Sequence, residues 1–306
     1  MASLTAVYGA PPLKLATVPQ GSVQLSPLVP GGQSMDTLDG GAFDAIVVLA
    51  PPGAIERRYV LAHALRLLKP GGELTALATK NAGGLRLRAE LEAFGCEVTD
   101  TPKGGHRICR CERPAAKPEG LDEVLAEGGP QILPDLGLWS QPGVFSWNRI
   151  DPGSAALVAH LPAGHSPLSG RGADFGCGIG YLSRTVLTSA KVTDLLLVDI
   201  DRRAVDAARR NIDDPRARFE HADVRHLALE NLDFVVMNPP FHDGGDEDRS
   251  LGQAFIRKAS QSLRKGKSCW LVANRHLPYE AILAECFTRV VPQETPGGYK
   301  VFEAIK

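Results

Sequence analysis

The sequence has few of the features that mark a disulfide-stabilised, zinc-binding or membrane-spanning protein. Its six cysteines contain no Cys-x-x-Cys pair and follow no regular spacing, so neither a zinc site nor a disulfide framework is indicated. Reduced thiols in a cytosol fit this usage best. Residues 1–14 have no basic segment followed by an apolar core, and no apolar run approaches the roughly 20 residues of a membrane span. We therefore predict a cytoplasmic protein with neither a membrane nor a metal partner.

The sequence also lacks a strong net charge. A formal net charge of -1 and an isoelectric point near 6.7 argue against a protein that coats nucleic acid by bulk charge. Any contact with RNA must therefore use a local patch. The clearest concentration of basic residues comprises Lys103, His106, Arg107, Arg110, Arg113 and Lys117. Such a run is usually a solvated face, but beside a catalytic domain it could equally hold phosphates.

The composition is that of an ordinary globular protein, with 43% hydrophobic and 23% charged residues, and 306 residues allow one or two domains. The first part of the chain alternates strands and helices. Residues 43–49 are predicted to form a buried strand, 54–68 a helix that stops at Pro-Gly-Gly, 73–78 a strand and 85–94 a helix. This alternation predicts a mostly parallel sheet.

The same order of elements returns later in the chain. Residues 43–52 parallel residues 232–240, because each range has an apolar strand followed by two prolines. Two copies of one half-fold are favoured, although convergent patterning would give the same likeness. The first copy has Leu49 and Ala50 where the second has Asn238, so it is predicted to be inactive. We expect a degenerate, non-catalytic domain at 1–113 that positions RNA, a linker at 114–142 and a catalytic domain at 143–306.

The second copy ends its strand at an unusual corner. The apolar run at 232–237 predicts a strand buried on both faces, and it stops at Asn-Pro-Pro-Phe, residues 238–241. Pro239 cannot continue a ladder, and two successive prolines hold the backbone extended and rigid. The Asn238 side chain and the neighbouring carbonyls are thus fixed where they can accept hydrogen bonds from an amine. The alternative is an ordinary turn, which Asn-Pro often begins.

A glycine-rich loop precedes this corner. Three glycines at alternate positions in residues 174–180 lie between a predicted strand and a helix that starts near Tyr181, so the backbone can turn sharply and approach a ligand. Asp199 ends the next strand about twenty residues beyond the loop, where a carboxylate can bind both hydroxyls of a ribose. Asp223 follows a third strand and could reach an adenine amino group. We expect Asp201 to cap the following helix.

The loop lacks the lysine and the serine or threonine of a phosphate-binding loop. Asp174 would repel a pyrophosphate but attract a cation, unless it only caps the loop. A ligand with a ribose, an adenine and a positive centre is predicted, which describes S-adenosylmethionine. The candidate cofactor-binding residues are Asp174, Phe175, Gly176, Cys177, Gly178, Gly180, Asp199, Asp223 and Asn238. Cys177 has no neighbouring base and is given no nucleophilic role.

Two sets of motifs carry a family resemblance. The first set comprises, in chain order, Asp-x-Gly-x-Gly-x-Gly at 174–180, Asp199, Asp223 and Asn-Pro-Pro-Phe at 238–241. With these residues in this order, the chain resembles class I S-adenosylmethionine-dependent methyltransferases that act on exocyclic amines. More narrowly, it is similar to the ribosomal RNA small subunit methyltransferase C group and its large-subunit relative. That similarity rests on Gly-Val-Phe-Ser at 143–146, Asp-x-Gly-Ser at 151–154, and the segments 238–242 and 272–279. It covers residues 142–306 well and the earlier part less well.

The resemblance implies a Rossmann-like α/β fold with a mixed, mostly parallel seven-stranded sheet, preceded by a smaller degenerate copy. It implies N2-methylation of a guanine in ribosomal RNA, most often 16S RNA. The expected partners are ribosomal RNA or the assembled small ribosomal subunit, and the expected state is a monomer. The expected catalytic residues are Asn238, Pro239 and Phe241. Phe145, Pro240, Phe241, His242, Arg275 and Lys300 are expected to bind substrate, with Phe241 stacking on the base.

Two other functions compete with this interpretation. The first is methylation of a glutamine N5 in a protein of the release-factor type, because a side-chain amide offers a similar flat nitrogen; that group usually has Tyr in place of Phe241. The second is a non-catalytic RNA-binding assembly factor that kept the fold. Intact Asp174, Asp199 and Asn238 favour an enzyme, because loss of chemistry tends to show first at such positions.

Overall fold

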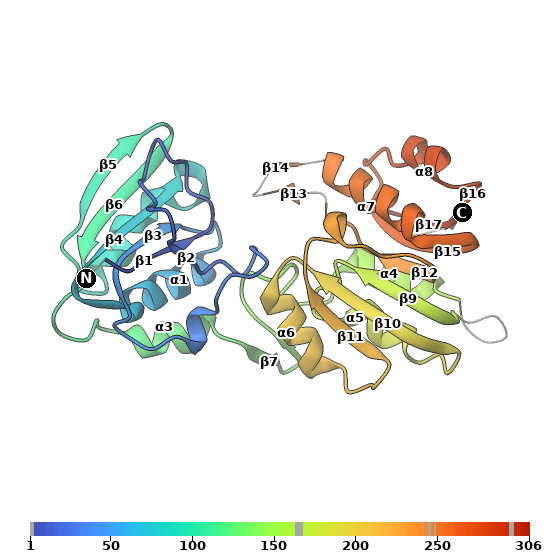
Figure 1. The fold of residues 1–306 in the computed structure, drawn as a ribbon, viewed down its shortest axis with the longest axis horizontal. Helices are drawn as coiled ribbons and strands as arrows, with labels where there is room; N and C mark the ends of the chain where they lie inside the picture. The colour runs from blue at the N-terminus through green and yellow to red at the C-terminus, as the bar shows by residue number, and fades with distance from the viewer. Residues whose placement is uncertain (1–2, 163–167, 241, 244–245, 248, 294–296) are drawn as a thin grey trace. The chain divides into compact units, whose positions relative to one another are not determined.

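A computed structural model describes residues 3–162, 168–240, 242–243, 246–247, 249–293 and 297–306. The chain divides into two compact units (Figure 1), one made of residues 1–130 and 141–143 and the other of residues 131–140 and 144–306. The segment expected to be a linker, 114–142, contains a helix of the first unit, α3 (Leu121–Gly128), and a hairpin of the second, β7 (Gln131–Leu133) with β8 (Leu138–Ser140).

The second unit is built on a seven-stranded sheet in the order β11-β10-β9-β12-β15-β17-β16. Its strands are β9 (Gly170–Phe175), β10 (Val192–Asp199), β11 (Ala217–His221), β12 (Leu232–Met237), β15 (Leu263–Asn274), β16 (Arg289–Gln293) and β17 (Tyr299–Ile305). The first five strands in this order are mutually parallel, and β17 is antiparallel to both of its neighbours. This sheet confirms the predicted fold class.

Helices cover both faces of this sheet (Figure 1). The strand β12 alternates between the two faces: Val235 and Met237 pack in the core with α7 (Arg249–Ser262) and α8 (Glu280–Cys286). Phe234 and Val236 pack in the opposite core with α4 (Pro152–His160), α5 (Tyr181–Val186) and α6 (Arg202–Asn211). Burial on both faces explains why β12 is an unbroken apolar run. A 3-10 turn, η4 (Val224–His226), and a small hairpin, β13 (His242–Asp243) with β14 (Asp246–Glu247), complete the unit.

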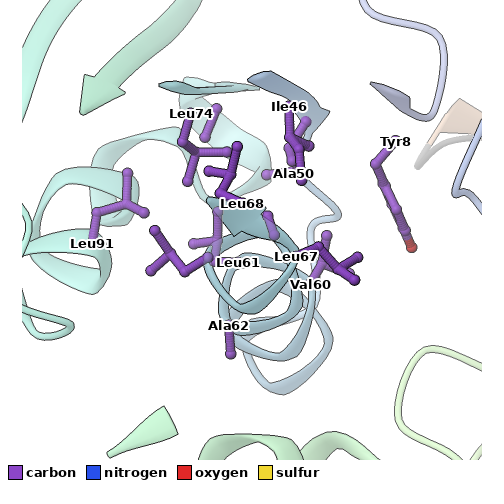
Figure 2. Close-up of a cluster of buried hydrophobic side chains, with 14 of the residues drawn as sticks. Tyr8, Ile46, Ala50, Val60, Leu61, Ala62, Leu67, Leu68, Leu74 and Leu91 are labelled. Carbon is purple, nitrogen blue, oxygen red and sulfur yellow. The ribbon is translucent and has the colours of Figure 1, made fainter. Parts of the chain in front are cut away.

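The first unit has a six-stranded sheet in the order β2-β1-β3-β4-β6-β5. Its strands are β1 (Thr5–Tyr8), β2 (Val23–Gln24), β3 (Phe43–Leu49), β4 (Leu68–Thr79), β5 (Thr99–Lys103) and β6 (His106–Glu112). One face is covered by α1 (Ala54–Leu67), α2 (Leu87–Glu92), α3 and the 3-10 turn η1 (Met35–Thr37). Two further 3-10 turns, η2 (Lys80–Ala82) and η3 (Gly84–Arg86), follow β4. Figure 2 shows Leu61 and Leu67 of α1 lying against strand residues such as Ile46 and Leu74.

The opposite face of the first sheet has a thinner cover. Val7, Val47, Leu77 and Ile108 pack against Leu15 and Ala16, which lie in turns between β1 and β2. In the second unit the corresponding face carries α4, α5 and α6. The first unit therefore has loops where the second has these three helices.

The two units nevertheless share details that simple αβ patterning does not explain. The β3–β4 pairing shifts register between Phe43 and Ala45, and the β12–β15 pairing shifts at the equivalent place, between Leu232 and Phe234. The aspartate after each shifted residue also accepts a backbone N–H from the segment at the first strand. The distance is 2.8 Å from Leu4 N to Asp44 Oδ2 and 3.0 Å from Arg171 N to Asp233 Oδ2. These agreements confirm that the first unit is a smaller copy of the same fold; in its described part no strand corresponds to β11.

Candidate active site

The predicted site residues gather at one edge of the second sheet. Because β9, β10, β11 and β12 are parallel, their carboxyl ends meet at that edge. The glycine-rich loop follows β9, Asp199 ends β10, Asp223 lies two residues after β11, and Asn238 follows β12. Ligands of open α/β sheets bind at this edge, so the fold brings together the residues that the sequence had separated.

The glycine-rich loop turns as its composition predicts. Gly176, Gly178 and Gly180 all have positive φ, at 75°, 53° and 86°, a region that favours glycine. At Gly180 a Cβ would also lie 2.9 Å from the Ile212 side chain. A Cβ built on Gly178 meets nothing within 4 Å, so its backbone faces open space where a ligand can approach closely.

Asp199 is held by the loop and by the residues that follow it. Its Oδ2 accepts a hydrogen bond from Gly178 N at 2.9 Å, and its Oδ1 accepts one from Asp201 N at 2.9 Å. Burial raises the pKa of Asp199 to about 6, and the charge of Asp201 adds to the effect. Asp201 caps α6 as predicted, with its Oδ1 accepting from Arg203 N at 3.0 Å.

Asp174 is fully buried beneath the loop. Its Oδ2 accepts a hydrogen bond from Ser183 Oγ at 2.6 Å, whereas its Oδ1 has no hydrogen-bond partner among the described residues. Burial raises its pKa to about 7, and the nearby charge of Asp199 contributes in the same direction. A cationic group near these two carboxyl groups would favour their ionised forms.

The Asn238 amide is fixed by two residues at the start of α4. Its Nδ2 donates to Asp151 Oδ2 at 2.9 Å and to Ser154 Oγ at 3.0 Å. Asp151 is the N-cap of α4 and also accepts from Ser154 N at 2.7 Å. An ionised carboxylate only accepts hydrogen bonds, so the amide nitrogen must face Asp151 and the amide oxygen must point to the other side. The sequence reasoning used residues 151–154 only as a family motif and did not predict this contact.

Other predicted residues have different surroundings. The Asp223 carboxylate is already bound by Arg225, whose guanidinium donates to both of its oxygens. Phe175 is fully buried, Cys177 is buried with its pKa raised by burial, and Phe145 is 59% exposed. Phe241 lies outside the described residues, and so does the side chain of His242.

Lys300 lies in β17, and Arg275 directly follows β15. Lys300 Nζ donates to Leu277 O at 2.9 Å and to Glu280 Oε1 at 2.6 Å. Together with Glu280 and Tyr299, these two residues line a cavity of about 620 Å³. Lys300 is therefore engaged in an ion pair at the wall of this cavity.

The edge fits S-adenosylmethionine better than a pyrophosphate. Asp199 offers a carboxylate for a ribose, Gly178 leaves room for close approach, and the buried Asp174 has one oxygen without a partner in the described structure. Two carboxyl groups suit a ligand with positive charges.

In the described ranges no group of three or more His, Cys, Asp or Glu residues could hold a metal, and no helix is long and apolar enough to cross a membrane.

This fold and this edge define a class I S-adenosylmethionine-dependent methyltransferase. Comparison with known families agrees: residues 135–303 match the family described as methyltransferase small domain. Among curated proteins, ribosomal RNA small subunit methyltransferase C of Pseudomonas paraeruginosa is 32% identical over 92% of this chain and 85% of its own length. The protein of the same name from Shewanella loihica is 29% identical over 85% and 76% of the two chains.

A solved structure is similar over nearly the whole chain. It is the T. thermophilus 16S rRNA N2 G1207 methyltransferase in complex with AdoMet and guanosine, with a TM-score of 0.73 and 27% identity, covering 96% of this chain and 78% of that one. The chain belongs to the ribosomal RNA small subunit methyltransferase C family.

Proposed function

We propose that this protein transfers the methyl group of S-adenosylmethionine to the exocyclic N2 of a guanine in ribosomal RNA of the small subunit. The observation that carries the proposal is the Asn238 amide, held with its oxygen directed away from Asp151 at the edge that also bears the glycine-rich loop. Family membership supports ribosomal RNA as the substrate. The T. thermophilus relative, named for a guanine N2 position, supports the finer choice.

The chemistry requires positioning more than acid–base catalysis. A guanine amine is a poor nucleophile because its lone pair is delocalised into the ring. Hydrogen bonds from its N–H groups to Asn238 Oδ1 and the Pro239 carbonyl would hold the amine and favour a lone pair directed at the methyl group. S-adenosylmethionine supplies an electrophilic methyl group on a sulfonium. As the nitrogen–carbon bond forms, the sulfur–carbon bond breaks, and the nitrogen then loses a proton that has become acidic. Correct placement therefore supplies most of the acceleration.

The remaining roles follow from the positions of the side chains. We assign the ribose to Asp199 and the cationic end of the cofactor to the neighbourhood of Asp174. The family resemblance, and not a described position, is our reason for expecting Phe241 to stack on the target base and Pro240 and His242 to contact it. Phe145 is sufficiently exposed to cover a ligand. Asp223, already bound by Arg225, contributes to adenine binding through its backbone neighbours and not through a free carboxylate.

We propose that the first unit is non-catalytic, because polar groups at its equivalent edge are already hydrogen-bonded within the unit. Gln24, at the end of β2, binds the backbone of Gly9 through its side-chain amide. Its Oε1 accepts from Gly9 N at 3.1 Å, and its Nε2 donates to Gly9 O at 2.9 Å. Arg57 donates to Pro52 O at 2.8 Å and is paired with Glu90 at 2.7 Å. The groups that would meet a cofactor or an amine are therefore already bound.

The first unit is proposed to position RNA through its basic residues. Arg107 is paired with Asp100, and Lys117 is paired with Asp122, so they are less suited to hold phosphate. Lys103 and Arg110 are exposed. Phosphate contacts from such residues add affinity without sequence information, which leaves the choice of guanine to the second unit.

The test uses purified protein with labelled S-adenosylmethionine and three acceptors from cells that lack the protein: naked 16S RNA, assembled small subunits and a release factor. Nuclease digestion and mass spectrometry are expected to find N2-methylguanine in one of the RNA acceptors. Absence of N2-methylguanine from both would refute the proposal, and labelled glutamine in the release factor would replace it.

The role of Asn238 is tested with Asn238→Ala. Removal of one preorganised group at a reacting centre typically lowers kcat by about 100- to 1000-fold. We expect a loss of this order with S-adenosylmethionine binding largely retained. Turnover at the wild-type rate would contradict the assigned role.

A further inference from the structure

We propose that Asp151 is a positioning residue that decides which end of the Asn238 amide faces the target amine. The inference rests on the proposed function, because it concerns the same methyl transfer. Asp151 lies 87 residues before Asn238 in the chain, and its carboxylate reaches across from the start of α4 to the end of β12.

The hydrogen bonds around Asn238 separate two possible orienting groups. Ser154 Oγ is 3.0 Å from Asn238 Nδ2, but a hydroxyl can donate or accept and therefore tolerates either end of the amide. Asp151 Oδ2 is 2.9 Å from Nδ2, and an ionised carboxylate can only accept. Asp151 is thus the group that discriminates between the two orientations.

The orientation matters because the two ends of the amide have opposite effects on an amine. With Nδ2 toward Asp151, Asn238 presents its oxygen, which can accept an N–H of the target. A flipped amide would place Oδ1 against the carboxylate and present N–H groups to an amine that must itself donate. The amine would lose its acceptor, and its lone pair would no longer be directed at the methyl group.

The carboxylate of Asp151 is itself held in place. It caps α4, accepting from Ser154 N at 2.7 Å, and Pro at the first turn suits a helix start. At the buried Gly153, a Cβ would lie 2.9 Å from the Tyr299 ring and 3.0 Å from Asp151 Oδ2. A side chain at 153 would therefore push on the carboxylate, which gives a physical reason for glycine at this position.

The first variant is Asp151→Asn. Asparagine caps a helix about as well as aspartate, so the fold should persist, but its amide can offer either a donor or an acceptor to Asn238. Loss of a charge-assisted hydrogen bond that fixes the amide should lower kcat by about 10- to 100-fold. The Kd for S-adenosylmethionine, the KM for RNA and the Tm should stay close to the wild-type values, a pattern that a purely structural role would not give.

Asp206→Asn is the matched control. Asp206 lies exposed on α6 and forms a surface pair with Arg209, so the variant makes the same change of charge away from the site. Its kcat should equal that of the wild type, which separates the effect of orientation from that of altered charge toward RNA.

An exchange of the two residues gives the sharper test. Asn238→Asp alone would place two carboxylates at hydrogen-bond distance, and its kcat should fall severely. In Asp151→Asn combined with Asn238→Asp, the new asparagine can turn its amide so that Oδ1 accepts from Ser154 N and Nδ2 donates to the new carboxylate, whose second oxygen still faces the amine. We expect the double variant to exceed the single Asn238→Asp variant in kcat by at least about 10-fold, as coupling between contacting residues predicts.

Wild-type kcat in Asp151→Asn, or a double variant no faster than Asn238→Asp, would overturn the inference. Failure of the proposed function has a different signature. If wild-type protein methylates an acceptor other than guanine, the proposed substrate is wrong, yet the same variants still decide the role of Asp151, because any amine acceptor requires the amide oxygen.

Discussion

The buried Asp174 makes protein stability depend on pH in a direction opposite to that of a salt-bridged carboxylate. Its pKa is raised from 3.8 to about 7 in the folded protein, because it is fully buried and Oδ1 finds no partner among the described residues. Between these two values the folded protein binds a proton that the unfolded chain releases. The free energy of unfolding must therefore fall as pH rises through this range and stay low above it.

The magnitude follows from the two pKa values. Each pKa unit is worth about 1.4 kcal/mol, so ionisation of Asp174 in the folded protein costs on the order of 4 kcal/mol. Part of this loss is already present at pH 5, because the unfolded chain is mostly ionised there. We expect about 2 to 3 kcal/mol to be lost between pH 5 and pH 8 through this residue.

The assay is urea unfolding of protein without cofactor at pH 5 and pH 8, comparing wild type with Asp174→Asn. The amide cannot ionise and can still accept from Ser183, so the variant should gain stability relative to wild type by about 2 to 3 kcal/mol on going to pH 8. A stability difference that is the same at both pH values would refute the reasoning.

A cationic cofactor favours the ionised carboxyl groups. The affinity of the wild type for S-adenosylmethionine should therefore rise from pH 5 to pH 8, with release of protons, and Asp174→Asn should bind S-adenosylmethionine more weakly than the wild type.

Two further predictions concern single side chains. Asp199→Ala should weaken S-adenosylmethionine binding, measured by calorimetry, by about 10-fold or more through loss of a charge-assisted hydrogen bond; unchanged affinity would exclude Asp199 as the ribose ligand. Arg57→Ala should lower the free energy of unfolding by about 3 to 5 kcal/mol, because it removes a buried guanidinium and leaves the largely covered Glu90 carboxylate without its partner; a change below about 1 kcal/mol in a denaturant titration would show that the pair contributes little to the stability of the first unit.

Much of the fold could be predicted because its elements depend on local patterns. The apolar runs at 43–49 and 232–237 became β3 and β12, and the glycine spacing at 174–180 produced the expected turn before α5. Asp201 capped its helix because a cap needs only the next two residues. The carboxyl-edge location of the site followed from parallel strands alone.

The parts that were missed depend on contacts between distant residues. The Asp151–Asn238 hydrogen bond joins positions 87 residues apart, and no local pattern reports on it. Asp223 was predicted to lie within reach of an adenine amino group, and the hydrogen bonds from Arg225 to both of its carboxylate oxygens were not foreseen. The segment 114–142 has the Pro and Gly content of a linker, yet residues 121–128 form α3, which packs against α1 through the side chains Leu121, Val124 and Leu125.

The comparison of the two copies indicates what an active edge requires beyond the sheet itself. In the second unit, the polar groups at the edge are held by neighbours in a way that leaves one end directed outward, as Asp151 does for Asn238. In the first unit, Gln24 and Arg57 bind the backbone of their own edge, and Leu49 has no polar group to present. We therefore attribute the inactivity that we propose for the first unit to polar groups that are hydrogen-bonded within their own edge. Introducing asparagine at position 49 alone is not expected to create a site, because Val7 of β1 stands where β9 has Asp174.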